Sequence, residues 1–411
     1  MQEYQNNYPI LLIHGLLGWG DQDGIDKKNI YPYWGIGPNN LVKHLRKKGY
    51  EVYNPTLGPF NGGHDRACIL WAYLFGGTVD FGKVWAEEHH VNRYGRTFEH
   101  GVLEDLGTKG DHAKINIVGH SFGGPTVKEV ANLFIQGDPK EVAGTDPDDL
   151  SPLFKGGHGH LLHTVTTLSG VNNGTTFATL MHDRGMSIIT YAIVGICYFL
   201  GETDVTKFYD HGMQHFGVGP YPWEYEGNHF RNPLKGIDAM RAYNANKAEG
   251  SIAREMMVEV VQEDINPKQV MSDDIYYFCH RADHTWPTLG KRRIPGLMNP
   301  LCLLPAPFTS TYMPEKLEKY GMGTDKNWMK NDGYVNVTGQ SAPLNQPSEE
   351  ATLKDDFKPG IWYNMPIIRA SHTWWNGMDS IIPTHYFKYY EKMFDKYRKL
   401  PDGEKVKTKK K

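Results

Sequence analysis

The chain has 411 residues, with 44 basic and 47 acidic side chains and a formal net charge of -3. This balance gives no electrostatic reason to expect a nucleic acid as partner. Charged residues make up 22% and aromatic residues 12% of the chain, which is typical of a folded globular protein and excludes a disordered one.

The composition also bears on membrane and compartment. The longest apolar run, at 188–200, is shorter than the roughly 20 residues of a membrane-spanning helix, so we expect no transmembrane anchor. No signal segment precedes "NNYPILLIHG", and the four cysteines show no CxxC spacing. The basic segment 400–411 is predicted to be a disordered tail.

Short runs of branched and aromatic residues, each ending near Gly, Pro, Asn or His, are predicted to be buried strands. In chain order they are "PILLIHG" from residue 9, "YEVYNP" from 50, "INIVGH" from 115, "LHTVTTLSG" from 162 and "IYYFCH" from 275. Helix-like periodicity lies between several of them, notably at 38–49 and 123–137. This alternation predicts an α/β fold with a mostly parallel central sheet and helices on both faces.

Two regions are longer than ordinary connections and are predicted to be insertions on this core. They span about 71–98 and about 175–253. We find no internal repeat and no low-complexity linker, so the sequence predicts one elaborated domain.

The motif G-x-S-x-G occupies 119–123, directly after a predicted strand and before a predicted helix. A tight strand-to-helix turn holds such a serine in strained backbone geometry and exposes its hydroxyl above the sheet. We therefore interpret Ser121 as a nucleophile. A serine hydroxyl needs a base, and the base needs an acid that orients it; in α/β-hydrolases the chain order is Ser, acid, His.

Two histidines and two acids fit that order. His372 is flanked by small residues and Gly, as in an exposed loop, whereas His385 begins an aromatic amphipathic helix and is more simply interpreted as packed. Asp332 lies on a sharp turn before the strand-like "YVNV", and Asp283 closely follows a predicted strand. Spacing favours His372 and Asp332 and leaves Asp283 open as the acid.

An ester hydrolase also needs backbone N–H donors for the oxyanion. Phe122, directly after the nucleophile, should supply one, and Leu16 in "LLIHGLLGWG" is the best candidate for the other. His14 precedes the serine in the chain and is interpreted as orienting this loop.

Many separate segments resemble the large bacterial triacylglycerol lipases of the staphylococcal and thermophilic bacillus type. Besides "HGLLGWG" and "GHSFGG", these are "YWG" at 33, "HDRAC" at 64, "GGTVDFG" at 76, "RYGRTF" at 93, "LSPLFKGGHGH" at 150, "TVTTLSG" at 164, "NNGTT" at 172 and "NDGYVN" at 331. The resemblance extends over about 8–390. It implies an α/β-hydrolase fold, secretion, and a lipid or other ester substrate met at an oil–water interface.

Site residues follow from the same resemblance. It implies Ser121 as nucleophile, Asp332 as acid and His372 as base, with Leu16 and Phe122 at the oxyanion hole. The family commonly carries Phe and Gln at these last two positions. Backbone donors tolerate that exchange.

The resemblance also implies metals, but this chain departs from the family at their ligands. The family's zinc site uses an Asp matching Asp65, two His, and a later Asp near Asp238. Trp85 and Val91 align with the two His, although His89 and His90 lie between them. Losing two imidazoles should abolish tight zinc binding.

Calcium in the family uses a Glu and an Asp beyond the catalytic His. Here Trp374 stands at the Glu position, and only Asp379 remains. A tryptophan supplies no oxygen ligand, so we expect no calcium site and no cofactor needed for the chemistry.

The stretch 181–205, within the second insertion, corresponds to the family's lid, and its apolar residues could cover the substrate pocket. The sequence thus predicts a serine hydrolase of carboxylic esters, most simply a triacylglycerol lipase. A short-chain or polyester esterase is the alternative within the enzyme class. A catalytically silent lipid-binding protein on the same fold is the alternative outside it.

Overall fold

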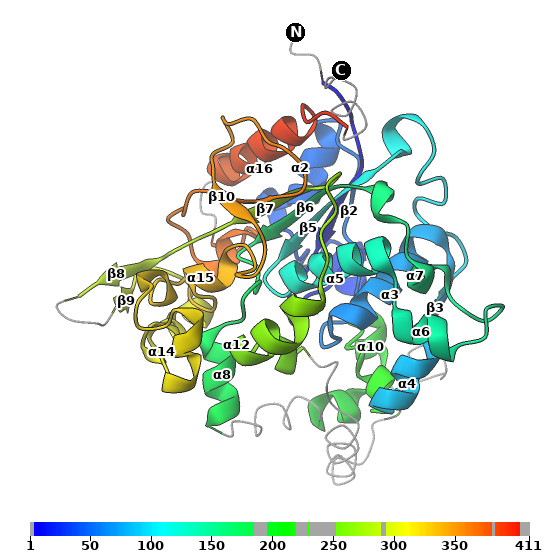
Figure 1. The fold of residues 1–411 in the computed structure, drawn as a ribbon, viewed down its shortest axis with the longest axis horizontal. Coiled ribbons are helices and arrows are strands. Elements are labelled where there is room, and N and C mark those ends of the chain that lie inside the picture. The colour runs from blue at the N-terminus through cyan, green and yellow to red at the C-terminus, as the bar shows by residue number, and fades with distance from the viewer. Residues whose placement is uncertain are drawn as a thin grey trace.

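A seven-stranded sheet forms the centre of the protein in the computed structural model (Figure 1), which describes residues 4–184, 195–201, 203–218, 229, 252–288, 293–379 and 383–402. Every strand pairing in this sheet is parallel. The strands, in spatial order, are β10 (Ser348–Glu350), β11 (Trp362–Asn364), β7 (Tyr276–His280), β6 (Leu162–Leu168), β5 (Ile115–His120), β1 (Ile10–Ile13) and β2 (Val52–Tyr53). The five strands predicted from the sequence are β1, β2, β5, β6 and β7.

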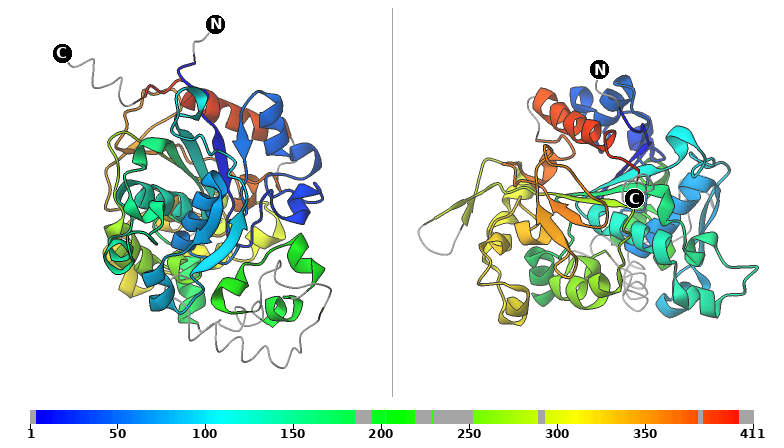
Figure 2. Two further views of the ribbon diagram at one scale, coloured as in Figure 1. Left: turned by 90° about the vertical axis from the view of Figure 1, so that its right-hand side faces the viewer. Right: turned by 45° about the horizontal axis from the view of Figure 1, so that its top comes forward.

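The two faces of the sheet carry two separate hydrophobic cores. Successive residues of β1 alternate between them: Leu11 and Ile13 belong to one core, Ile10 and Leu12 to the other. This follows from the period of two in a strand, and because both faces are covered, every residue of β1 is buried. Figure 2 shows helices on both sides of the sheet, as the sequence predicts.

Helices α3 (Gly63–Phe75) and α5 (Gly123–Gln136) contribute to the first core, and α2 (Leu41–Lys47) and α16 (Pro383–Tyr397) to the second. The other α-helices that lie wholly within the described residues are short. They are α1 (Gly24–Lys27), α4 (Lys83–His89), α6 (Pro139–Gly144), α7 (Pro152–Lys155), α8 (Thr176–Asp183), α10 (Asp204–Phe208), α12 (Val258–Val260), α13 (Pro300–Leu303), α14 (Ala306–Thr311) and α15 (Val337–Gln340).

Two small antiparallel sheets lie outside the central one. In the first predicted insertion, the end of α3 is followed by β3 (Gly77–Asp80), α4 and β4 (Tyr94–Phe98), and β3 pairs with β4. The second small sheet is a hairpin of β8 (Thr285–Pro287) and β9 (Arg293–Pro295), which projects from the body of the molecule in Figures 1 and 2.

Two predicted segments lie partly outside the described residues. The apolar lid stretch 181–205 is described at 195–201 and 203–205 and at its start, and residues 195–200 are helical. In the tail 400–411, Leu400 is buried and Asp402 accepts a hydrogen bond from the Tyr8 hydroxyl, so order extends into the segment predicted to be disordered. No helix among the described residues is long and apolar enough to cross a membrane.

One local prediction is wrong. The segment "YVNV" after Asp332 is not a strand, because it forms a tight turn closed by a single bridge between Asn331 and Asn336, after which α15 begins. Asparagine and aspartate side chains stabilise this turn by bonding to backbone N–H groups.

Candidate active site

Ser121 lies on the sharp turn between β5 and α5, at the carboxyl edge of the sheet. Its φ of 59° is in the left-handed region, which is strained for a residue with a side chain. The turn is possible because Gly119 has no side chain: a Cβ there would lie 1.9 Å from the Gly123 carbonyl oxygen. The geometry is that of a nucleophile elbow, as the motif predicts.

The loop after β1 passes directly beside this serine. A Cβ on Gly15 would lie 2.7 Å from the Ser121 Cβ and 3.1 Å from its Oγ, so only glycine permits this approach. Among the described residues, the backbone N–H groups of Leu16 and Phe122 donate to no protein acceptor. Two free amides on the segments that meet at Ser121 are what an oxyanion hole requires.

His14 fixes the direction of the Leu16 amide. Its Nε2 accepts a hydrogen bond from the Leu57 N–H (3.0 Å), so the proton is on Nδ1, which donates to the Gly15 carbonyl (2.9 Å). The Gly18 N–H donates to the same carbonyl at 3.2 Å. Because C=O and N–H of a trans peptide point in opposite directions, holding the Gly15 carbonyl turns the Leu16 N–H away from His14.

The charge of His14 agrees with this assignment. Burial, together with the nearby Arg66 guanidinium, lowers the pKa of His14 well below its ordinary value, so the imidazole is neutral. The orienting role that the sequence analysis assigns to His14 is therefore consistent with its geometry.

His372 and Asp332 form a direct pair. His372 Nδ1 lies 2.8 Å from Asp332 Oδ2, and the His372 backbone N–H also donates to the Asp332 carbonyl at 2.8 Å. The other carboxylate oxygen of Asp332 accepts the N–H groups of Tyr334 and Val335 within the turn. With its Nδ1–H directed at a completely buried carboxylate, the ring presents Nε2 as the basic nitrogen.

The alternative acid and base do not share this arrangement. Asp283 forms ion pairs with Arg293 (2.8 Å) and Arg369 (3.9 Å) and accepts hydrogen bonds from Thr285. His385 is exposed on α16, so its interpretation as a packed residue is wrong. Of the candidates that the sequence left open, Asp332 is the one in contact with His372.

Ser121 is connected to His372 through His120, the residue before it in the chain. Among the described residues, Ser121 Oγ makes no hydrogen bond to His372, and catalytic hydrogen bonds are often long before substrate binds. His120, which precedes the serine, lies against the His372 ring with centroids 4.8 Å apart. Its Nε2 is 3.0 Å from the His372 carbonyl oxygen.

Tyr33 extends this connection to the loop after β1, which carries Gly15 and Leu16, although the sequence assigns Tyr33 no role. The Gly15 N–H donates to the Tyr33 hydroxyl oxygen (2.9 Å), so the hydroxyl proton is free to go to His120 Nδ1 (2.7 Å). His120 then carries its proton on Nε2 and donates to the His372 carbonyl. Burial, with a smaller effect from His372, lowers the pKa of His120 well below its ordinary value, which keeps it neutral. The only signal was that Tyr33 lies in "YWG", one of the segments that resemble the lipases.

The side chain of Phe122 packs in the interior, while its backbone N–H stays free of any acceptor among the described residues. The ring is completely buried, and the Arg66 guanidinium lies over it with Cζ 5.5 Å from the ring centroid. Arg66 is itself buried and donates to the His14 carbonyl. Burial lowers the pKa of Arg66 to about 9, yet Arg66 remains charged at neutral pH and fixes His14 at the start of the loop after β1.

The residues expected near a zinc site do not fit one. Asp65 is buried, and its Oδ1 accepts the Trp85 indole N–H at 3.0 Å. Its Oδ2 accepts the Asn61 amide at 3.2 Å and lies 2.9 Å from His215 Nε2. Although burial opposes ionisation, His215, His64 and the Asn61 amide hold the pKa of Asp65 below its ordinary value. Both oxygens are therefore engaged by protein groups.

The displaced histidines do not complete a zinc site either. His89 packs on the Trp85 ring, with centroids 3.9 Å apart, and His90 is exposed at the end of α4. Asp238 lies outside the described residues. Among the residues that are described, no three His, Cys, Asp or Glu side chains come together as metal ligands. His215 was missed because it lies in the second insertion, far from Asp65 in sequence.

Asp379 is likewise engaged by protein donors. Its oxygens accept the Asn299 amide (2.9 Å), the Thr373 hydroxyl (2.8 Å) and the Ser371 hydroxyl. Trp374, at the other expected calcium position, packs among Trp375, Tyr386 and Tyr389. The residues do not fit calcium. Because Ser371 and Thr373 flank His372, Asp379 instead stabilises the loop that carries the base.

Comparison with known proteins places this geometry in a family. Residues 6–405 match the family described as "Lipase-like, C-terminal domain". A lipase from Staphylococcus epidermidis strain RP62A is 31% identical over 375 residues, which are 91% of this chain and 50% of that protein. The chain thus spans about half the length of this relative.

Two solved structures resemble the whole chain. The Staphylococcus hyicus lipase has a TM-score of 0.80 at 25% identity and covers 97% of both chains. EstA from Clostridium botulinum has a TM-score of 0.77 at 29% identity, over 96% of this chain and 89% of that one. These comparisons confirm the resemblance and the α/β-hydrolase fold predicted from the sequence motifs. The chain belongs to the family of lipase-like C-terminal domains.

Proposed function

We propose that this protein is a carboxylic-ester hydrolase of the lipase type that works through an acyl-enzyme intermediate on Ser121. The observation that carries the proposal is the contact between His372 Nδ1 and Asp332 Oδ2, which are 2.8 Å apart. The backbone carbonyl of His372 also contacts His120, the residue before the strained Ser121. The similar proteins described above include two staphylococcal lipases and EstA, which supports the same class of reaction.

In the proposed mechanism, His372 Nε2 takes the proton from the Ser121 hydroxyl as Oγ attacks the ester carbonyl carbon. The N–H groups of Leu16 and Phe122 stabilise the negative charge that develops on the carbonyl oxygen. His372 then gives the proton to the departing alcohol oxygen as the ester C–O bond breaks.

A water molecule then repeats the sequence on the acyl-enzyme. His372 removes a proton from the water, whose oxygen attacks the acyl carbon, and the proton returns to Ser121 Oγ as the fatty acid leaves. Throughout, Asp332 holds the imidazole in the Nδ1–H tautomer and stabilises its positive charge. The residues near Asp65 and Asp379 do not fit zinc or calcium, so we assign no step to a metal.

The test is turnover of a soluble nitrophenyl ester by Ser121→Ala. We expect kcat to fall by about 10⁴- to 10⁶-fold, because nucleophile and base act as one unit. Ser348→Ala, an exposed serine on the edge strand β10, is the matched control and should retain turnover. A serine-reactive phosphonate should add one label to the parent and none to Ser121→Ala.

The same experiment decides against the alternative outside the enzyme class. A silent lipid-binding protein would neither turn over the ester nor take the label, and unchanged turnover by Ser121→Ala would place the chemistry elsewhere. A series of esters of increasing acyl length, assayed below and above their solubility limits, then separates a lipase from a short-chain or polyester esterase.

A further inference from the structure

An unusual set of large apolar side chains is exposed between residues 286 and 308. Leu297 is 95% exposed and Leu304 is 73% exposed. Four more are between half and three-fifths exposed, and together the six define what we call the 286–308 patch: Trp286, Ile294, Leu297, Leu301, Leu304 and Phe308. Single exposed apolar residues are normal on a protein surface, but a concentration of them marks a site of interaction.

The local structure presents these side chains outward. Trp286 and Ile294 are directly paired across the β8–β9 hairpin. Leu301, Leu304 and Phe308 follow at spacings of three and four, so they share one side of the α13–α14 segment. The opposite side packs into the protein, where Cys302 and Ala306 are buried against Tyr334.

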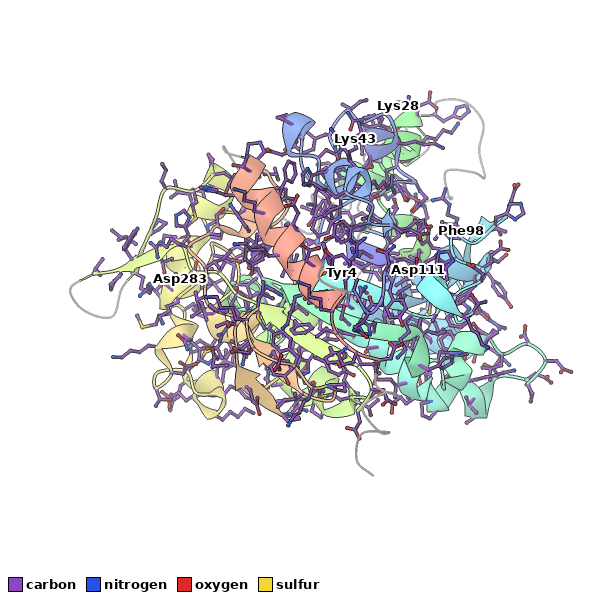
Figure 3. All side chains as sticks on the ribbon, turned by 90° about the horizontal axis from the view of Figure 1, so that it is seen from above. Tyr4, Lys28, Lys43, Phe98, Asp111 and Asp283 are labelled. Carbon is purple, nitrogen blue, oxygen red and sulfur yellow. The ribbon has the colours of Figure 1, made fainter. Side chains whose placement is uncertain are left out.

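The hairpin and α14 lie together at one side of the molecule, and α14 contacts β9. Figure 3, in which Asp283 marks the base of the hairpin, shows the hairpin extending away from the body on the side opposite Phe98. The patch is therefore a protruding surface, accessible to a broad apolar phase.

The patch also adjoins the candidate active site. The Asn299 side chain, directly before α13, donates to Thr373, the residue after His372. A Cβ on Gly333, the residue after Asp332, would lie 2.7 Å from Cys302 Cβ. The inner side of the α13–α14 segment thus packs on the residues next to the acid and the base, and its outer side carries the patch.

The charged residues around the 286–308 patch indicate which kind of surface it would bind. Between His284 and Pro314 the described residues include no Asp or Glu, and Arg293 is basic. Arg369 also lies over the Trp286 ring, with Cζ 3.7 Å from its centroid. Asp283 pairs with both Arg293 and Arg369 at the base of the hairpin, so two guanidinium groups face one carboxylate and leave an excess of positive charge among these described groups.

We propose that the 286–308 patch docks the protein on an anionic lipid–water interface. Exposed Leu, Trp and Phe side chains with basic residues beside them bind such surfaces by burying apolar area and by attraction to negative head groups. Docking there would bring the residues around His372 and Asp332 close to the lipid. The proposal concerns binding and does not rest on ester hydrolysis.

The test is vesicle flotation of the Ser121→Ala protein, which separates binding from turnover. Vesicles are made of phosphatidylcholine alone or of phosphatidylcholine with phosphatidylglycerol. We expect flotation with the anionic vesicles and at least about tenfold weaker binding by Leu297→Ser/Leu304→Ser/Phe308→Ser, since each of the three substitutions removes an apolar contact with lipid. Val142→Ser, a half-exposed residue of α6 at the opposite side of the molecule, is the matched control.

Fold and oligomeric state are checked on the same proteins. Near-ultraviolet circular dichroism guards against misfolding of the triple variant, and the single variant Leu297→Ser, at an almost fully exposed position, should still weaken binding. Absence of flotation by the parent, or equal flotation by parent and triple variant, would overturn the proposal. A parent dimer that becomes a monomer in the triple variant would also overturn it, because the patch would then be a subunit interface.

Discussion

Two buried carboxylate–imidazole pairs lie in this molecule and differ in what surrounds them. Asp332 and His372 are 2.8 Å apart, and Asp65 and His215 are 2.9 Å apart. Both carboxylates are almost completely inaccessible. A distance of this kind therefore does not distinguish a catalytic pair from a structural one.

The difference lies in the second contacts. The remaining oxygen of Asp332 is held by backbone N–H groups, and Nε2 of His372 has no hydrogen-bond partner among the described residues. Asp65 is held by side chains from other segments, Asn61 and Trp85, and His215 is 2% exposed. An imidazole nitrogen without a hydrogen-bond partner does not separate the pairs, because His215 Nδ1 also lacks one among the described residues. The first pair lies beside the strained turn at Ser121, whereas the second joins α3, the β3–β4 insertion and residues 213–216 into one unit.

The largest expected effect comes from breaking the two pairs at their histidines. His372→Ala should lower kcat by about 10⁴- to 10⁶-fold, because the proton of Ser121 loses its acceptor. His215→Ala should lower the free energy of unfolding by about 3–5 kcal/mol, because it leaves the Asp65 carboxylate buried without its partner. Ester turnover and chemical denaturation of both variants measure these effects.

Each of these variants is the control for the other. His215→Ala protein that remains folded at low temperature should keep most of its kcat. If the kcat of folded His215→Ala fell as far as that of His372→Ala, the separation into a catalytic and a structural pair would be wrong.

A smaller effect on kcat is expected at Tyr33, which is connected to His372 through His120. Tyr33→Phe removes the hydroxyl that accepts the Gly15 N–H and donates to His120, so both the oxyanion loop and the His372 carbonyl lose part of their support. We expect kcat to fall by about 10- to 100-fold, the size of effect that small misplacements of reacting groups produce. KM should change little, since Tyr33 is not placed against substrate.

The matched variant is Tyr31→Phe, whose ring packs on Trp19 outside this network. It should leave kcat unchanged. Steady-state kinetics of both variants makes the comparison, and a Tyr33→Phe protein with unaltered kcat but lowered stability would reduce Tyr33 to a packing residue.

Most of the central fold could be predicted from the sequence, for a physical reason. Strands β1, β5, β6 and β7 are buried at every residue, so they are rich in branched and aromatic side chains, and β1 is a continuous apolar run. The turn after Asp332 was misread as a strand, because Tyr and Val favour strands but the Asn and Asp side chains bind the local backbone.

The residues of the candidate site could be predicted only where they are close in sequence or lie in a segment that resembles the lipases. The elbow at Ser121 is local, whereas spacing alone could not choose between Asp283 and Asp332. Tyr33 and His120 are 87 positions apart, and His120 and His372 are 252 apart. No periodicity links such positions, so the hydrogen-bond network that joins them could be seen only in three dimensions.

The smallest effect is expected from metals at the Asp65–His215 pair. A chelator should leave the melting temperature of the parent unchanged, because both Asp65 oxygens are already bound by protein donors.

The variant Trp85→His sharpens the comparison. It removes the indole donor and places a third nitrogen or oxygen ligand beside Asp65 and His215, which is near the minimum number of ligands for zinc. Zinc at one hundred times its Kd should then stabilise this variant by about 2.7 kcal/mol, measured by thermal unfolding with and without the metal, and should not affect the parent. Trp85→Phe, which removes the indole donor without adding a ligand, is the control and should not respond to zinc. A parent protein that melts earlier after chelation would show instead that a metal contributes to its fold, and the Asp65–His215 pair would no longer be a self-sufficient structural counterpart of the Asp332–His372 pair.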